Sequence, residues 1–237
     1  MRATLILTSA IKPSLNSPGL RHTNHELRLK ETLICLKKWQ RIAETNNLDC
    51  ILVDNTYSEL ELKSKIPNSL FPNLQLLSAP AVSKLELRRG AGYAELRSLQ
   101  FITSILNLNS DSLIIKCNAR YYIRNFQNLF SFVDNYNKIY FYTNLRVDRA
   151  ETKFFISTFE HLKNFLKFAE DKVGLQPNTH LENLLAKYIN LYAFNESISL
   201  PIEPVIFGTG GHTGQKYRII NEAWAHNKIN LIFKKLR

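Results

Sequence analysis

The stretch DSLIIKCNARYYIRN, residues 111–125, decides how the rest of the chain is organised. It contains the apolar run 113–115, which is typical of a short buried strand because β-branched side chains pack well on a pleated sheet. Lys116 and Arg120 follow that run closely. Two cations at the end of a core strand predict an anion-binding site, and the alternative is that they are solvated surface charges.

A β–α–β unit opens the chain, well before this stretch. Residues 4–8 are apolar and predict a first strand, residues 26–45 carry apolar side chains every three or four positions, as in a helix, and residues 50–53 predict a second strand. Two strands joined by a helix of this length normally pair in parallel, with a right-handed crossover. This half of the chain is therefore predicted to form a parallel α/β sheet.

The remaining elements continue the α/β pattern in one domain over residues 1–237. Strands are predicted at residues 74–77 and 139–142, helices at 96–106, 154–172 and 181–192, and an extended segment at 198–206. The basic, apolar tail, residues 218–237, is predicted to be a helix that packs on the sheet or lies on a membrane.

The composition favours a globular protein with a hydrophobic core over a membrane-spanning or disulfide-rich one. The 237 residues are 45% hydrophobic, enough for a sizeable core, yet no stretch approaches the roughly 20 apolar residues that cross a bilayer. The first residues lack a signal-peptide core of the usual length, so we expect a cytoplasmic protein. Cys35, Cys50 and Cys117 lack the spacing of a zinc site or disulfide framework and are predicted to be buried thiols.

The net charge of +11 favours phosphate-bearing partners. It does not choose among nucleotides, nucleic acids and anionic lipids. Polar residues lie at the ends of two of the predicted strands: Thr8 is the last residue of the first, and Asp54 and Asn55 come directly after the second. Because ligands of open α/β sheets bind beyond the carboxyl ends of the strands, we expect these three residues at the same edge as Lys116.

A basic, glycine-bearing loop begins the helix that follows the third strand. Arg89, Gly90 and Gly92 precede Glu95 there. Such a loop can cradle a phosphate, because the free N–H groups and the positive end of the helix point the same way, and an ordinary turn is the alternative.

Five motifs follow one another along the chain. They are RLKET (residues 28–32), VDNT (53–56), RGAGYAE (89–95), KCNARYYIRN (116–125) and GTGGHTGQKY (208–217). Their order resembles that of the small bacterial glycosyltransferases of polysaccharide and O-antigen gene clusters. The chain departs from the family pattern at Arg89, where lysine is expected, and at Ala119, where glycine is expected.

The resemblance implies a GT-A-like α/β fold, with a mostly parallel central sheet flanked by helices. It also implies transfer of a sugar from a nucleotide-activated donor to a growing cell-surface glycan. The residues expected to bind the donor are Thr8, Asp54, Asn55, Arg89, Gly90, Gly92, Asn118, Tyr121, Gly210 and His212.

Four charged residues are the candidate catalytic groups. Glu95 is the first choice for the general base and Asp148 the second, although either carboxylate could instead cap a helix or pair with a cation. The chain has no Asp-x-Asp, the sequence that commonly holds a metal ion in GT-A enzymes. Lys116 and Arg120 are therefore predicted to neutralise the leaving phosphate, and no Mg²⁺ or Mn²⁺ is expected.

The expected partners are a nucleotide-sugar donor and a glycan or lipid-linked glycan acceptor. The inner face of the cytoplasmic membrane, an anionic surface, is a further candidate, and no nucleic acid is expected. Two alternatives remain open. One is a phosphoribosyl-type or other phosphate-handling transferase of the same pathway, and the other is a basic nucleic-acid-binding protein.

Overall fold

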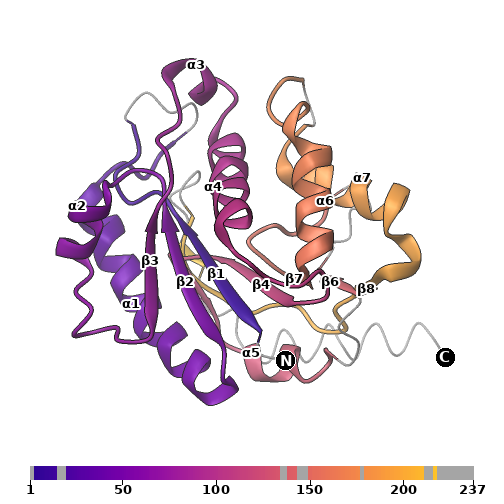
Figure 1. The fold of residues 1–237 in the computed structure, drawn as a ribbon, viewed down its shortest axis with the longest axis horizontal. Coiled ribbons are helices and arrows are strands. Elements are labelled where there is room, and N and C mark those ends of the chain that lie inside the picture. Colours follow the sequence, from indigo (N-terminus) through magenta and orange to yellow (C-terminus); the bar gives the residue numbers. More distant parts are fainter. Residues whose placement is uncertain are drawn as a thin grey trace.

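The computed structural model describes residues 3–14, 20–133, 138–142, 149–176, 179–210 and 216–217, which form a single α/β domain (Figure 1). The strands of the large sheet are β1 (Thr4–Ser9), β2 (Asp49–Asp54), β3 (Leu74–Ser78), β4 (Leu113–Asn118), β6 (Ile139–Phe141), β7 (Phe154–Thr158) and β8 (Ser197–Ser199). A smaller sheet contains β5 (Tyr121–Ile123), β9 (Ile206–Thr209) and β10 (Lys216–Tyr217). The helices are α1 (His25–Asn46), α2 (Glu59–Lys65), α3 (Lys84–Leu87), α4 (Ala91–Ile105), α5 (Phe126–Phe130), α6 (Phe159–Glu170), α7 (Leu181–Tyr192) and the 3₁₀ turn η1 (Phe194–Glu196).

The large sheet has the order β3-β2-β1-β4-β7-β6-β8, and its strand pairings make all strands except β7 run in one direction. From β1 the chain passes to β2 and β3 on one side, and then places β4 on the other side of β1. The point between β1 and β4 is therefore a topological switch point, where open α/β sheets bind their ligands. Thr8 and Asn118 are partners in register at the carboxyl end of this pair.

Helices cover both faces of the large sheet (Figure 1). Side chains of successive strand residues point to opposite faces, so Ile6 and Ile114 join the core under α4, α6 and α7. Leu7 and Ile115 join the core that includes α1, α2 and α5. Trp39 of α1 is fully buried in that second core, and its indole N–H donates to the backbone carbonyl of Tyr121, 2.7 Å away.

The prediction of a helix over residues 154–172 is wrong at its start. Phe154–Thr158 is strand β7, antiparallel to β4, and the helix begins only at Phe159. Phe154 packs in one core and Phe155 in the other, which a strand buried on both faces allows. Thr158 caps the helix, because its hydroxyl accepts the backbone N–H of His161 at 3.1 Å.

Most of the other predicted elements are confirmed. The strands at 4–8, 50–53, 74–77 and 113–115 and the helices at 26–45 and 181–192 are present, with boundaries shifted by at most three residues. Short elements were missed, namely α3, α5 and β5, and β8 and β9 occupy only the two ends of the segment predicted to be extended. The predicted tail helix, residues 218–237, lies outside the described residues.

Within the described ranges, no helix combines the length and the apolar character that crossing a bilayer requires.

Candidate functional site

A buried ion pair lies at the carboxyl edge of the sheet, beside the switch point. Lys116 on β4 points toward α4, and its ammonium forms an ion pair with Glu95 Oε1. The same oxygen of Glu95 accepts a hydrogen bond from the Thr8 hydroxyl at 3.1 Å. Asn118 Oδ1 accepts from the ammonium at 2.9 Å. We call Thr8, Glu95, Lys116 and Asn118 the switch-point cluster.

The ammonium of Lys116 has no exposed surface and is fully engaged. Its third acceptor is the backbone carbonyl of Thr152, 2.5 Å away, and an ammonium has three N–H donors. Glu95 keeps 18% of its side chain exposed, against 0% for Lys116. The pair therefore presents its carboxylate, rather than its ammonium, toward the outside of the protein. That Lys116 grips a leaving phosphate stays a prediction, which requires the ammonium to exchange one of these partners.

Arg120 lies beyond the same strand end, on the α1 side of the sheet. Its Nη1 donates to the carbonyl of Thr209 on β9 at 3.0 Å, and its side chain is almost entirely buried. The Thr209 hydroxyl donates to Glu31 Oε1 at 2.6 Å, and Glu31 Oε2 lies 2.8 Å from His22 Nε2. These contacts connect the chain after β4 to α1 and to β9.

A second buried guanidinium, that of Arg28, lies close to Arg120. It donates to the carbonyls of Ala10 and His22, each at 2.9 Å. Burial first, and then the positive charge of Arg120, lower the pKa of Arg28 to about 9, and the negative charge of Asp54 opposes this shift. Arg28 and Arg120 thus place two guanidiniums at this edge of the sheet, beside the carboxylates of Asp54 and Glu31.

Asp54 is fully buried and already saturated with hydrogen bonds. Its carboxylate accepts from Ser9 Oγ (2.5 Å), Ile11 N (3.0 Å), Thr56 N (2.7 Å), Thr56 Oγ1 (2.6 Å) and Tyr57 N (2.9 Å). Its visible contribution is to fix the two loops that follow β1 and β2.

Asn55 is next to Asp54 and differs from it in having a free acceptor. Its amide N–H donates to the carbonyl of Ala94 at 3.1 Å, one residue before Glu95. Its Oδ1 is buried and has no hydrogen-bond partner among the described residues. Buried polar atoms are normally paired, so this oxygen is suited to a donor supplied by a ligand.

The glycine loop before α4 contacts the end of α6 through Arg89, rather than the switch-point cluster. Arg89 stacks on Tyr93, and its guanidinium donates to the carbonyls of Val173 and Glu170, at 2.9 and 2.6 Å, where α6 ends. Gly90 is the N-cap of α4 and has a φ of 88°, with open space where a Cβ would be. The backbone at Gly90 is therefore open to a ligand, whereas Arg89 faces α6.

The other predicted site residues are less informative. Tyr121 is buried on β5 and packs edge-to-face against Tyr217, and burial raises the pKa of its phenol. Gly210 is buried directly after β9. Asp148 and His212 lie outside the described residues. Sequence reasoning did not select Thr152, and it quoted Arg28, Glu31 and Thr209 only within motifs, because their contacts are distant in the chain.

Comparison with known proteins gives a fold but no family. No protein-family model matches the chain, and neither does any curated protein sequence. Solved structures do match. A protein described as a glucose-1-phosphate thymidylyltransferase of Bacillus anthracis, in complex with sucrose, has a TM-score of 0.52 and 8% identity over 90% of this chain and 92% of that one.

Two further structures give similar values. The galactosyltransferase LgtC, in complex with donor and acceptor sugar analogues, has a TM-score of 0.51 and 8% identity, covering 83% of this chain and 72% of that one. Residues 1–349 of Staphylococcus aureus TarS give 0.51 and 14% identity over 88% of this chain. This chain spans only 60% of that TarS fragment. The fold is thus of the GT-A-like type, found in both glycosyltransferases and nucleotidyltransferases.

Proposed function

We propose that the chain is a glycosyltransferase that moves a sugar from a nucleotide-activated donor to a glycan acceptor at the switch point between β1 and β4. One observation carries this proposal. The chain has no Asp-x-Asp, its central strand β4 ends in Lys116, Cys117 and Asn118, and the lysine forms an ion pair with a partly exposed carboxylate. A built-in cation and a carboxylate are the two charges that a metal-independent sugar transfer needs at this point.

Glu95 is the proposed general base. Thr8 and Lys116 both hold its Oε1, so the carboxylate is fixed in orientation while part of it stays accessible. A base must accept the proton of the acceptor hydroxyl as that oxygen attacks the sugar, and a positioned carboxylate contributes roughly 10²–10⁴-fold to such a step. Lys116 is then a positioning residue in the first instance, because it fixes the base.

Arg120 is the proposed contact for the leaving phosphate. It lies with Arg28 at the same edge, so the chain supplies two guanidiniums there. Fixed cations stabilise charge that develops on a leaving group. Asn55 Oδ1, buried and without a partner in the described part of the chain, is the proposed acceptor for an N–H of the donor.

A donor screen and a transfer assay test the proposal together. Thermal shifts with UDP, CMP and other nucleotides identify the donor base, since a ligand that binds only the folded state raises the melting temperature. With a radiolabelled sugar donor of that base, Glu95→Gln should lose about 10²–10⁴-fold in transfer rate and keep its shift with the nucleotide. Glu170→Gln, the same change at a half-exposed site on α6, is the control and should keep its rate. Transfer that survives Glu95→Gln would overturn the assignment of the base.

A sugar nucleotidyltransferase is the second candidate, because the Bacillus anthracis structure matches nearly the whole of both chains. The two reactions differ in their products. A nucleotidyltransferase releases pyrophosphate from a nucleoside triphosphate and a sugar phosphate, whereas a glycosyltransferase releases a nucleotide from a sugar nucleotide. Pyrophosphate release with sugar phosphate, without transfer to any glycan, would favour the second candidate.

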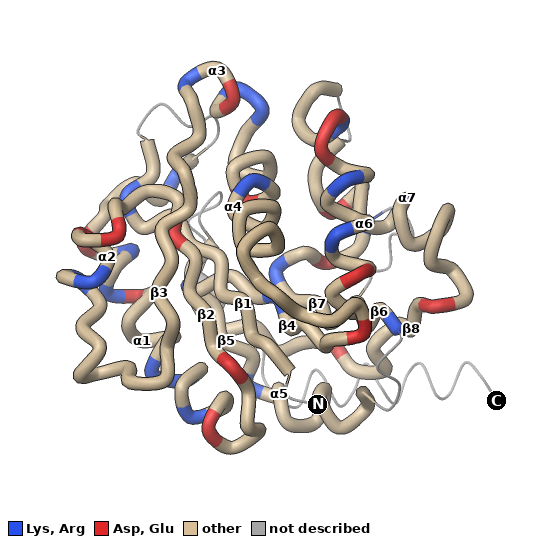
Figure 2. Tube along the Cα trace, viewed as in Figure 1, with Lys and Arg blue, Asp and Glu red and all other residues tan. Residues whose placement is uncertain are grey.

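The remaining alternatives have separate tests. Stabilisation by a phosphoribosyl pyrophosphate alone would favour a phosphoribosyl-type transferase. Lysine and arginine are distributed over α1, α2, α4 and α6 (Figure 2), which gives no specific support to a nucleic-acid interface. The proposed acceptor is a lipid-linked cell-surface glycan at the inner membrane face, and co-sedimentation of the full chain with anionic vesicles tests this part.

A further inference from the structure

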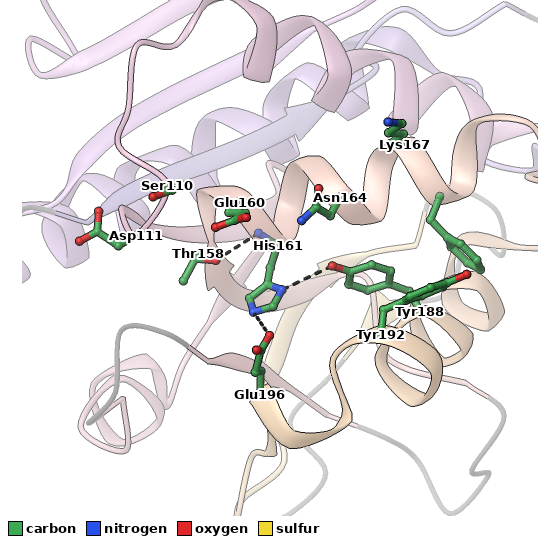
Figure 3. A pocket seen from close by; sticks show the side chains of 11 residues that line it. Ser110, Asp111, Thr158, Glu160, His161, Asn164, Lys167, Tyr188, Tyr192 and Glu196 are labelled. Carbon is green, nitrogen blue, oxygen red and sulfur yellow. Dashed lines mark hydrogen bonds and ion pairs between the residues drawn. The ribbon is translucent and has the colours of Figure 1, made fainter.

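A cavity of about 830 Å³ lies between α6, α7 and η1 (Figure 3). Ser110 and Asp111, just before β4, and Thr158, at the end of β7, form one of its sides. The cavity is therefore at the amino end of β4, whereas the switch-point cluster is at the carboxyl end. Five residue steps of strand separate Leu113 from Asn118, about 17 Å at 3.3 Å per residue, so one small ligand cannot occupy both places.

The charge of the lining is unusual for this chain. Three carboxylates, those of Asp111, Glu160 and Glu196, line the cavity together with one lysine, Lys167, in a protein whose net charge is +11. Excess negative charge opposes the binding of phosphate or nucleotide. This cavity is therefore chemically distinct from the arginine-rich edge where the donor is proposed to bind.

The floor of the cavity is pre-organised by a small hydrogen-bond network. The ring of His161 lies between Glu196 and Tyr188 (Figure 3), with 3.1 Å to Glu196 Oε2 and 3.4 Å to the Tyr188 hydroxyl. Burial, and then the negative charges of Glu196 and Glu160, raise the pKa of Tyr188 to about 12. The phenol thus stays a neutral hydrogen-bond donor at the bottom of the cavity.

Aromatic rings form one wall. Phe168, Tyr188 and Tyr192 pack on one another with ring centroids 5.5–5.9 Å apart, and Tyr192 is 65% exposed. A rigid aromatic surface beside a few polar groups is the usual make-up of a small-molecule site, and the volume is within the usual range of such sites.

These features select the chemical class of the ligand. A sugar ring has apolar C–H faces that pack on an aromatic surface, and hydroxyls that both donate and accept hydrogen bonds. Carboxylates can accept from those hydroxyls, Lys167 can donate to them, and the amide of Asn164 can do both. An anionic ligand would meet three carboxylates, and a cationic ligand, which their charge favours, is the alternative that the test below separates.

We propose that this α6–α7 cavity is a second ligand site that binds a neutral saccharide, remote from the transfer site. The proposal does not depend on which transfer reaction the chain catalyses, because it rests on the cavity alone.

Ligand-detected saturation-transfer NMR on the full chain tests it, with lactose, maltotriose and N,N′-diacetylchitobiose as probes, and choline and inorganic phosphate as the charged comparisons. At least one saccharide should bind, and Tyr192→Ala and Asn164→Ala should each weaken its binding about tenfold. Leu191→Ala, 59% exposed on the same helix and outside the lining, is the matched control and should bind as the wild type does.

Three outcomes would overturn the proposal. They are an absence of binding by every saccharide, saccharide binding that Tyr192→Ala and Asn164→Ala leave unchanged, and binding of choline or phosphate in place of the saccharides. The second would place the sugar elsewhere, including at the transfer site. Failure of the proposed transfer reaction would appear only in the assays of Glu95→Gln, so the two hypotheses can fail separately.

Discussion

Replacing Lys116 by methionine tests whether its ammonium is committed to internal contacts. The change keeps the aliphatic stem in the core and removes the charge, so Glu95 loses its ion-pair partner and the carbonyl of Thr152 loses its donor. Removing one partner of a buried ion pair typically costs about 3–5 kcal/mol. At roughly 2–4 °C per kcal/mol for a chain of this size, the melting temperature should fall by about 6–20 °C.

Urea unfolding followed by circular dichroism measures this loss, and a double-mutant cycle isolates the pair. Glu95→Gln alone leaves the buried ammonium without its counter-charge, so the combined variant should be more stable than the sum of the two single changes predicts. A coupling energy of about 0.5–3 kcal/mol is the expected range. Lys187→Met, at an exposed position on α7, is the control and should change stability by less than about 0.5 kcal/mol.

A loss for Lys116→Met no larger than that for Lys187→Met would refute this reasoning. The ammonium would then be free of strong internal partners and available to a phosphate, as the sequence predicts. Loss of activity in a variant that is also less stable would be uninformative about chemistry, so transfer rates must be measured well below each variant's melting temperature.

Three further predictions follow from other parts of the molecule. Gly208→Ala should lower the free energy of unfolding by at least about 1–3 kcal/mol, because φ at Gly208 is 134° and a Cβ there would overlap the carbonyl oxygen of Arg120. Gly92→Ala, in the first turn of α4, should be neutral or stabilising in the same urea titration. Burial raises the pKa of Cys50 from 9.0 to about 12, so between pH 9 and 12 the thiol loses its proton in the unfolded state but keeps it in the folded state. The free energy of unfolding of the wild type, relative to that of Cys50→Ala, should therefore be unaffected by this thiol below pH 9 and fall by about 1.4 kcal/mol per pH unit between 9 and 12. EDTA should leave the transfer rate unchanged, and inhibition that Mn²⁺ reverses would contradict metal-independent catalysis.

The fold was largely predictable because its signals are local. Alternating or continuous apolar runs mark the strands, and the buried stripe of α1 repeats every three or four residues. The prediction that the helix begins at residue 154, instead of at Phe159, was wrong for a physical reason. Phe155 and Phe159 are spaced as on one helix face, but the consecutive apolar residues of β7 are explained by burial between two helical layers, and a single sequence does not reveal that burial.

The site was predictable only in part. Position after a strand marked Lys116 and Arg120, and a charged residue on the buried stripe of α1 could have marked Arg28. The partners of these cations come from distant segments, such as Thr209, which is 89 residues after Arg120. No local pattern encodes such a contact, so sequence reasoning could place the cations at the edge without showing which of their N–H groups were already engaged.

Strand β7 is antiparallel to both of its neighbours and extends from one candidate site to the other. Its first residue, Phe154, comes two positions after Thr152, whose carbonyl contacts Lys116 at the transfer edge, and its last residue, Thr158, lines the α6–α7 cavity. The register of β7 against β4, with Phe155 opposite Lys116 and Thr158 opposite Leu113, therefore fixes the distance between the transfer site and the cavity. A slip of one residue in that ladder would exchange the faces of every β7 side chain and disturb both ends at once. An engineer who reshapes either site should leave this ladder intact.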